Sequence, residues 1–136
     1  LRRDWKAAFT SQAEEFSNIS LSVTAGALPN GLRGTLYKNG PANFERGGQE
    51  YAHWLDGDGY MTALHISDGL ASWSGRYVAT DAYTEEVSSN KVKYRTTFGT
   101  QKPGGPLVNA LDIRLKSPAN TNVIALGARG PLLALW

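Results

Sequence analysis

Residues 59–79 of the chain read GYMTALHISDGLASWSGRYVA, and this stretch decides the fold class. On both sides of Ser67-Asp68-Gly69 the residues alternate along the chain, so every second side chain would lie on the same face of an extended strand. Serine, aspartate and glycine are typical residues of a tight turn between two strands. The stretch therefore predicts an antiparallel β-hairpin formed by residues 59–66 and 70–79.

Four more segments have the composition of strands. They are residues 19–25, 32–38, 121–126 and 131–136, separated by Gly, Pro and Asn. The last two are apolar on both faces, which predicts that both faces are covered. The sequence thus predicts an all-β fold, in which the 59–79 hairpin and the 121–136 hairpin together form one four-stranded blade of a β-propeller.

Three segments do not fit the strand pattern. In residues 4–16, large apolar side chains recur at spacings of three and four, which predicts a short amphipathic helix or, equally, a docked arm. Residues 84–93 are predicted to hold one or two helical turns, with Thr84 as the N-cap and Glu85 and Glu86 in the first turn. Residues 101–106, QKPGGP, are predicted to be a loop.

The composition excludes several classes of protein. The chain has 136 residues, of which 41% are hydrophobic, and this predicts one folding unit over residues 1–136 with no internal boundary. Fourteen basic and twelve acidic residues leave a net charge of +2, too small to predict binding to nucleic acid. The chain has no cysteine, which fits a reducing compartment, and no apolar run of the ~18–20 residues that span a bilayer. The apolar run at 132–136 is interpreted as part of a longer protein, cut inside a strand.

The segment HWLDGDG at 53–59 is the first candidate for a metal site. Asp56 and Asp58 could begin a calcium loop, but that motif requires Asp or Asn, Gly and Glu where this chain has Tyr60, Met61 and Ser67. We therefore expect a structural turn in which the aspartates accept hydrogen bonds from backbone amides. Its glycines are expected to adopt positive φ.

The remaining candidates are also predicted to be structural. His53 is expected to be a hydrogen-bonded structural residue, and His65 a semi-exposed strand residue, because two histidines do not make a metal site by themselves. The glycine pairs at 47–48 and 104–105 lack the flanking residues of a phosphate loop and are predicted to be turns. The residues thus identify no catalytic, cofactor-binding or metal-ligating side chain.

A series of segments, in order along the chain, nevertheless resembles the carotenoid cleavage oxygenases, and leans toward the apocarotenoid oxygenases. These segments are GTLYKNGP (34–41), FERGG (44–48), HWLDGDG (53–59), YR (94–95), FGTQ (98–101), DIRLK (112–116), ANTNV (119–123) and LLALW (132–136). The resemblance covers essentially the whole chain.

The resemblance implies a seven-bladed β-propeller, of which this chain would hold the first blade and the strands that lead into it. It also implies one iron(II) held by four histidines, which uses O₂ to cleave a conjugated double bond of a carotenoid or apocarotenoid into aldehydes. The family's iron-binding histidines lie downstream of this chain, and His53 does not match one of them. The resemblance therefore carries no catalytic or metal residue to this chain, and the chain alone is expected to be inactive.

The resemblance also implies partners and leaves alternatives. The expected reactants are an apolar polyene and O₂, in a cytoplasmic protein for which contact with a membrane surface is left open. Lys38, Tyr60 and Ala79 depart from the family's usual residues, which leaves the substrate undecided. A stilbene-cleaving or retinoid-isomerase-like relative and a non-catalytic β-rich binding module remain the alternatives.

Overall fold

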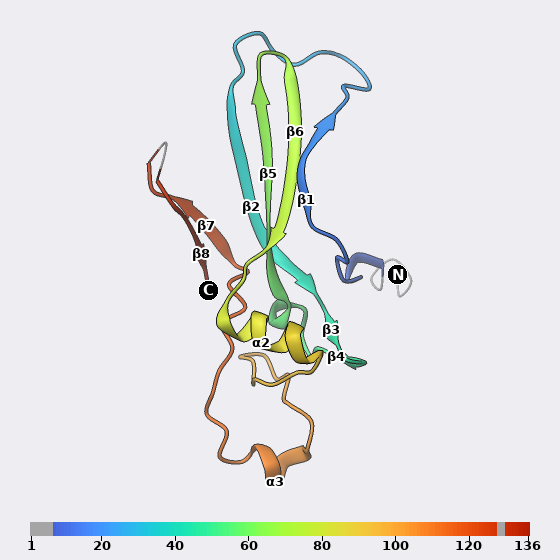
Figure 1. Ribbon diagram of the computed structural model, residues 1–136, viewed down its shortest axis with the longest axis vertical. Coiled ribbons are helices and arrows are strands. Elements are labelled where there is room, and N and C mark those ends of the chain that lie inside the picture. Colours follow the sequence, from blue (N-terminus) through green and yellow to red (C-terminus); the bar gives the residue numbers. More distant parts are fainter. Residues whose placement is uncertain (1–6, 128–129) are drawn as a thin grey trace.

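A four-stranded antiparallel sheet forms the body of the chain in a computed structural model that describes residues 7–127 and 130–136 (Figure 1). The strand order is β1 (Phe16–Leu21), β6 (Leu70–Tyr77), β5 (Asp58–Ser67) and β2 (Gly34–Asn43). The other elements are β3 (Glu45–Arg46), β4 (Gln49–Glu50), the 3₁₀ turn η1 (Trp54–Asp56), α2 (Asp81–Ser89), α3 (Gly105–Asn109), β7 (Asn122–Ala125) and β8 (Leu132–Leu135).

The central hairpin is confirmed. β5 and β6 pair from Tyr60 with Tyr77 to Ser67 with Leu70. Asp68 and Gly69 both have positive φ, of 53° and 77°, as the favoured two-residue hairpin turn requires. The pairing therefore puts alternate side chains of residues 59–79 on opposite faces of the sheet, as the sequence predicted.

The two outer strands differ from their predicted ranges for reasons of pairing. β1 ends at Leu21, opposite Ala71, because β6 has reached its turn there and offers no partner to residues 22–25. β2 continues to Asn43 because β5 pairs with it as far as Asp58. Pro41 is tolerated in β2 because this strand lies at the edge of the sheet.

The prediction of which strands form the four-stranded sheet was wrong. β7 and β8 do form a hairpin, but the hairpin is a separate two-stranded sheet. β1 and β2 already occupy both edges of the β5–β6 hairpin, so the β7–β8 hairpin has no edge there to join. It lies beside β2, where the Asn39 side-chain amide donates to the backbone oxygen of Asn122 at 2.9 Å.

The predictions for the three segments outside the strands, residues 4–16, 84–93 and 101–106, were correct only in part. Of residues 4–16, positions 4–6 lie outside the described residues and only 7–8 are helical. Residues 9–15 form an arm that docks on the sheet, where Tyr60 Oη donates to the backbone oxygen of Glu14 at 2.9 Å. α2 begins earlier than predicted because Thr80, and not Thr84, is the N-cap and accepts from the amide of Tyr83. The loop predicted at 101–106 gives way to α3 at Gly105.

Polar side chains dominate the interior of the described residues. The buried hydrophobic residues are Tyr60, Val92 and Ala119, whereas ten polar or charged residues are buried. Four of the charged ones, Arg46, Asp58, Glu86 and Lys116, lie where α2, β5 and the segment after α3 meet, at the lower end of the sheet in Figure 1. The buried ion pairs that join α2 to the sheet are therefore found at this end of the molecule.

Candidate functional site

Four buried charges form a closed network, which we call the charge cluster: Arg46, Asp58, Glu86 and Lys116. Lys116 Nζ lies 2.6 Å from Asp58 Oδ1 and 2.7 Å from Glu86 Oε2. Arg46 contributes a second cation, whose Nη2 lies 2.8 Å from Asp58 Oδ2. Two cations therefore neutralise two carboxylates away from water.

Tyr51 lies at the centre of the charge cluster. Its hydroxyl accepts a hydrogen bond from Lys116 Nζ at 3.2 Å and lies 3.3 Å from Asp58 Oδ2. The Lys116 ammonium is also 5.0 Å from the centre of the Tyr51 ring, within range of a cation–π contact. The ring thus shields the ion pair, and the hydroxyl adds a hydrogen bond to it.

Each member of the charge cluster comes from a different segment. Arg46 ends β3, Asp58 begins β5, Glu86 lies on α2, and Lys116 follows α3 by seven residues. Glu86 also accepts backbone hydrogen bonds through Oε1, from Lys93 at 2.8 Å and from Tyr94 at 3.2 Å. The cluster therefore joins residues 79–118 to the start of the central strand, as a hydrophobic core would do elsewhere.

Asp56 forms a second polar junction beside the first. It accepts hydrogen bonds from Thr100 Oγ1 at 2.7 Å and from the amides of Phe98 and Thr100. Asn120 completes the junction, because its amide nitrogen donates to the backbone oxygens of Leu55 at 2.8 Å and Gly57 at 2.6 Å. The prediction that the aspartates accept from backbone amides is confirmed for Asp56, whereas Asp58 forms ion pairs instead.

The prediction of positive φ for the glycines of this turn was wrong. Gly57 has φ −64°, and Gly59 is not among the positive-φ residues. The reason for glycine is a close approach of backbone: a Cβ on Gly57 would lie 2.7 Å from the Asn43 oxygen, and one on Gly59 would lie 2.8 Å from the Pro118 oxygen. Gly47 and Gly48 form the predicted turn, and both have positive φ, of 59° and 81°.

The two histidines have different environments. His53 Nδ1 accepts from the amide of Leu55 at 3.1 Å and so caps η1, and its ring stacks on Phe98 with centroids 4.8 Å apart. His65 is exposed on β5, 2.9 Å from Thr35 Oγ1. His53 is therefore a hydrogen-bonded structural residue, as predicted.

An open groove of about 730 Å³ lies next to the Asp56 junction. Its walls are largely aromatic and are formed by Phe9, Phe44, Tyr51, His53 and Trp54, with Glu45 and Glu50 also lining it. No group of three or more histidine, cysteine, aspartate or glutamate side chains that could hold a metal occurs in residues 7–127 and 130–136. The described residues therefore do not fit an iron site, and the expectation that no metal ligand or catalytic residue lies in this chain stays a prediction.

Three positions depart from the carotenoid oxygenase pattern. Lys38 and Ala79 are exposed, so these departures disturb no buried ion pair. Tyr60 is buried, its ring packs against Tyr77 with centroids 4.9 Å apart, and it covers Gly75, where a Cβ would lie 2.5 Å from its ring. The large side chain at position 60 is thus accommodated by the absence of a side chain at position 75.

Sequence reasoning missed the charge cluster, although a signal for part of it was present. The segments that carry the family resemblance contain Arg46, Asp58 and Lys116, one in each segment. Glu86 lies outside these segments, in a helix whose charged residues resemble those of any solvated helix. A buried charge needs a partner of opposite sign, so matching the charges between segments could have suggested three of the four members.

Burial and the charge cluster raise the pKa of two groups. The pKa of Tyr51 is raised above 10.0 by burial and then by the Asp58 carboxylate. Burial alone would lower the pKa of Lys116, but Asp58, Tyr51 and Glu86 outweigh it and raise this pKa above 10.5. The folded state therefore holds both protons more tightly than the unfolded chain does.

This shift predicts a loss of stability in alkali. Below about pH 10 the folded protein and the unfolded chain both hold these protons, and the stabilisation is complete. Above about pH 10 the unfolded chain releases them first. The free energy of unfolding therefore falls as the pH rises through the folded-state pKa values. Denaturant unfolding of the complete protein between pH 8 and pH 11 measures this fall, and Tyr51→Phe should make it shallower. Equal unfolding midpoints over the whole range would contradict the assignment.

A family comparison identifies the chain. The family model described as retinal pigment epithelial membrane protein matches residues 9–136. The chain belongs to this family. The resemblance to carotenoid cleavage oxygenases is thereby confirmed.

Individual members of the family agree with this assignment. Apocarotenoid-15,15'-oxygenase of Synechocystis sp. is 41% identical over 135 residues, which cover 98% of this chain and 27% of that protein. Resveratrol cleavage oxygenase 1 of Aspergillus fumigatus is 34% identical over 121 residues, 87% of this chain and 22% of its own length. The crystal structure of cobalt-substituted Synechocystis ACO superposes with a TM-score of 0.92 at 40% identity, over 100% of this chain and 28% of that one. The chain thus spans about a quarter of the length of these family members.

Proposed function

We propose that the complete protein is an iron(II)-dependent oxygenase that cleaves a conjugated double bond of an apocarotenoid. In this reaction the C=C bond and the O–O bond break, and each carbon receives one oxygen atom, so a polyene and O₂ give two aldehydes. The observation that carries the proposal is the 41% identity to an apocarotenoid-15,15'-oxygenase over nearly the whole chain. The cobalt-substituted ACO structure supports a metal-dependent reaction.

The part that this chain takes in the reaction is proposed to be structural. The iron would be held by histidines in parts of the protein that this chain does not span, on the axis of a seven-bladed β-propeller whose first blade includes the β1–β6–β5–β2 sheet. The charge cluster and the Asp56 junction fix the path from α2 to β7 against this sheet. We also propose a cytoplasmic location, which the lack of cysteine supports.

Product analysis of the complete, iron-loaded protein tests the proposal. With an apocarotenal and ¹⁸O₂, we expect two carbonyl products, each with one labelled oxygen before exchange with water, and we expect no turnover in the absence of O₂. Products without label, or no cleavage of any apocarotenal tested, would overturn it.

A stilbene substrate is the second candidate, and the similarity to a resveratrol cleavage oxygenase favours it. Parallel assays with resveratrol separate the two, because the preferred substrate should show the higher kcat/KM. A preference for the stilbene by tenfold or more would select this alternative.

A further inference from the structure

The chain contains two Asn-Gly pairs, Asn30-Gly31 and Asn39-Gly40. An asparagine side-chain amide hydrolyses most readily before glycine, because the glycine nitrogen can attack the asparagine Cγ without hindrance from a side chain of its own. The attack also requires a side-chain amide that is free of hydrogen bonds and a backbone that can rotate toward it. The tertiary structure therefore decides which of the two pairs can react.

Asn30 and Gly31 form an exposed turn in the connection between β1 and β2, which runs at the end of the sheet that carries the β5–β6 turn (Figure 1). The amide of Leu32 donates to the Pro29 oxygen at 3.1 Å, so Asn30 and Gly31 are the two central residues. Gly31 has φ 80°, as a type II turn requires at this position. Among the described residues, neither the Asn30 side chain nor the Gly31 amide has a hydrogen-bond partner. Little therefore opposes a rotation that brings the Gly31 nitrogen to Asn30 Cγ.

Asn39 and Gly40 are held in place by hydrogen bonds. The Asn39 side-chain nitrogen donates to the backbone oxygens of Ala119 at 2.8 Å and Asn122 at 2.9 Å. The backbone of both residues lies in β2, where it pairs with β5. Attack by the Gly40 nitrogen would break both side-chain hydrogen bonds and distort the paired strand. This pair is therefore protected as long as the protein is folded.

We propose that Asn30 is a site of spontaneous deamidation, at which the folded protein converts asparagine to a mixture of aspartate and isoaspartate. The Gly31 nitrogen loses its proton and bonds to Asn30 Cγ, and the side-chain amide leaves as ammonia, which gives a succinimide ring. Water then opens the ring and restores the N–H group. Attack of water at the side-chain carbonyl gives aspartate, and attack at the backbone carbonyl gives isoaspartate. One water is consumed and one ammonia is released, so the reaction needs no oxidant, metal or cofactor and does not depend on the cleavage of a polyene.

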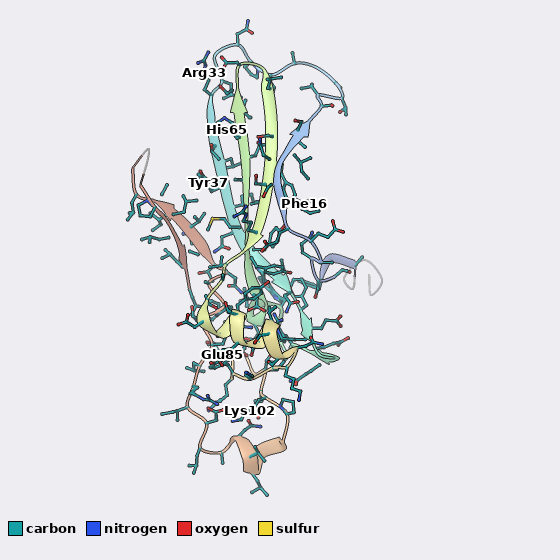
Figure 2. All side chains as sticks on the ribbon, viewed as in Figure 1. Phe16, Arg33, Tyr37, His65, Glu85 and Lys102 are labelled. Atoms are coloured by element: carbon teal, nitrogen blue, oxygen red, sulfur yellow. The ribbon has the colours of Figure 1, made fainter. Side chains whose placement is uncertain are left out.

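Deamidation at this position places a new charge next to an ion pair. Arg33 lies three residues after Asn30 and pairs with Asp68 in the β5–β6 turn (Figure 2 shows Arg33 at this end of the sheet). A carboxylate at position 30 lowers the net charge by one and competes with Asp68 for the Arg33 guanidinium. The side chains of Arg33 and Asp68 are 66% and 60% exposed, so their pairing contributes little to stability. The modified form is therefore expected to accumulate as a folded charge variant.

Incubation of the complete protein under native conditions, followed by tryptic peptide mapping, tests the proposal. Trypsin cleaves after Arg33 and Lys38, so Asn30 and Asn39 are in different peptides. Mass spectrometry and labelling by an isoaspartyl methyltransferase should detect isoaspartate at position 30 that forms at least tenfold faster than at position 39. The rate should be severalfold higher at pH 9 than at pH 7, because the attack requires loss of the Gly31 amide proton. In guanidinium chloride, where the hydrogen bonds of Asn39 are lost, both positions should react.

Two variants show whether the turn itself is the reacting group. Asn30→Gln should abolish the signal at position 30, because a glutamine side chain must close a larger ring, and it leaves the net charge unchanged. Gly31→Ala should slow the reaction severalfold, because the added methyl group hinders the attack, although nothing lies within 4 Å of a Cβ built there. Absence of isoaspartate at position 30 in the folded protein would mean that another part of the complete protein holds or covers this turn, and would overturn the proposal. Equal rates at positions 30 and 39 in the folded protein would overturn it as well.

Discussion

Replacement of Lys116 by methionine is expected to lower the free energy of unfolding by about 3–5 kcal/mol. Lys116 is 2% exposed and pairs with two carboxylates at once. Its loss leaves Arg46 as the remaining cation of the charge cluster, and Arg46 Nε lies 3.7 Å from Glu86. The cost therefore comes from a buried negative charge without a partner, which the methionine chain cannot offset by packing.

Denaturant unfolding of the complete protein measures this loss, with Lys91→Met as the matched control. Lys91 is exposed, so its replacement should change stability by no more than about 0.5 kcal/mol. The double variant Lys116→Met, Glu86→Gln should recover part of the loss, because it restores the balance of one cation and one anion. Equal stabilities of the Lys116→Met and Lys91→Met proteins would show that the cluster does not hold the fold.

Replacement of Gly59 by valine is expected to cost about 1–3 kcal/mol or more through overpacking. A Cβ at this position would overlap the backbone oxygen of Ala119 and lie 2.8 Å from that of Pro118. The Gly59 amide also donates to the Pro118 oxygen at 2.8 Å, so the two segments cannot separate without losing this hydrogen bond. The expected result is a lower melting temperature with near-normal turnover by the protein that remains folded.

Gly40→Ala is the control for this prediction. Gly40 lies on β2 opposite Tyr60, and nothing lies within 4 Å of a Cβ built there. Its replacement should leave the melting temperature nearly unchanged. A Gly59→Val protein that melts normally but no longer cleaves substrate would place this turn in the active site instead.

The local sequence determined the elements that depend on neighbouring residues. The alternation in residues 59–79 and the Ser67-Asp68-Gly69 turn predicted the β5–β6 hairpin, because the side-chain period of a strand and the φ values of a turn are properties of consecutive residues. The 121–136 hairpin was predicted on the same basis. The family segments added the fold family, which no single residue could indicate.

Only the tertiary structure decided which segments meet. The strands beside the central hairpin are those that pair with its two edges. These strands are β1 and β2, and not β7 and β8. Gly59 is required by the approach of Pro118 and Ala119, almost sixty residues away, and not by its own φ. Glu86 looks like a solvated helical residue in sequence and is fully buried in the fold. A charge can be buried only where a distant segment brings the opposite charge, and no pattern of consecutive residues contains that pairing.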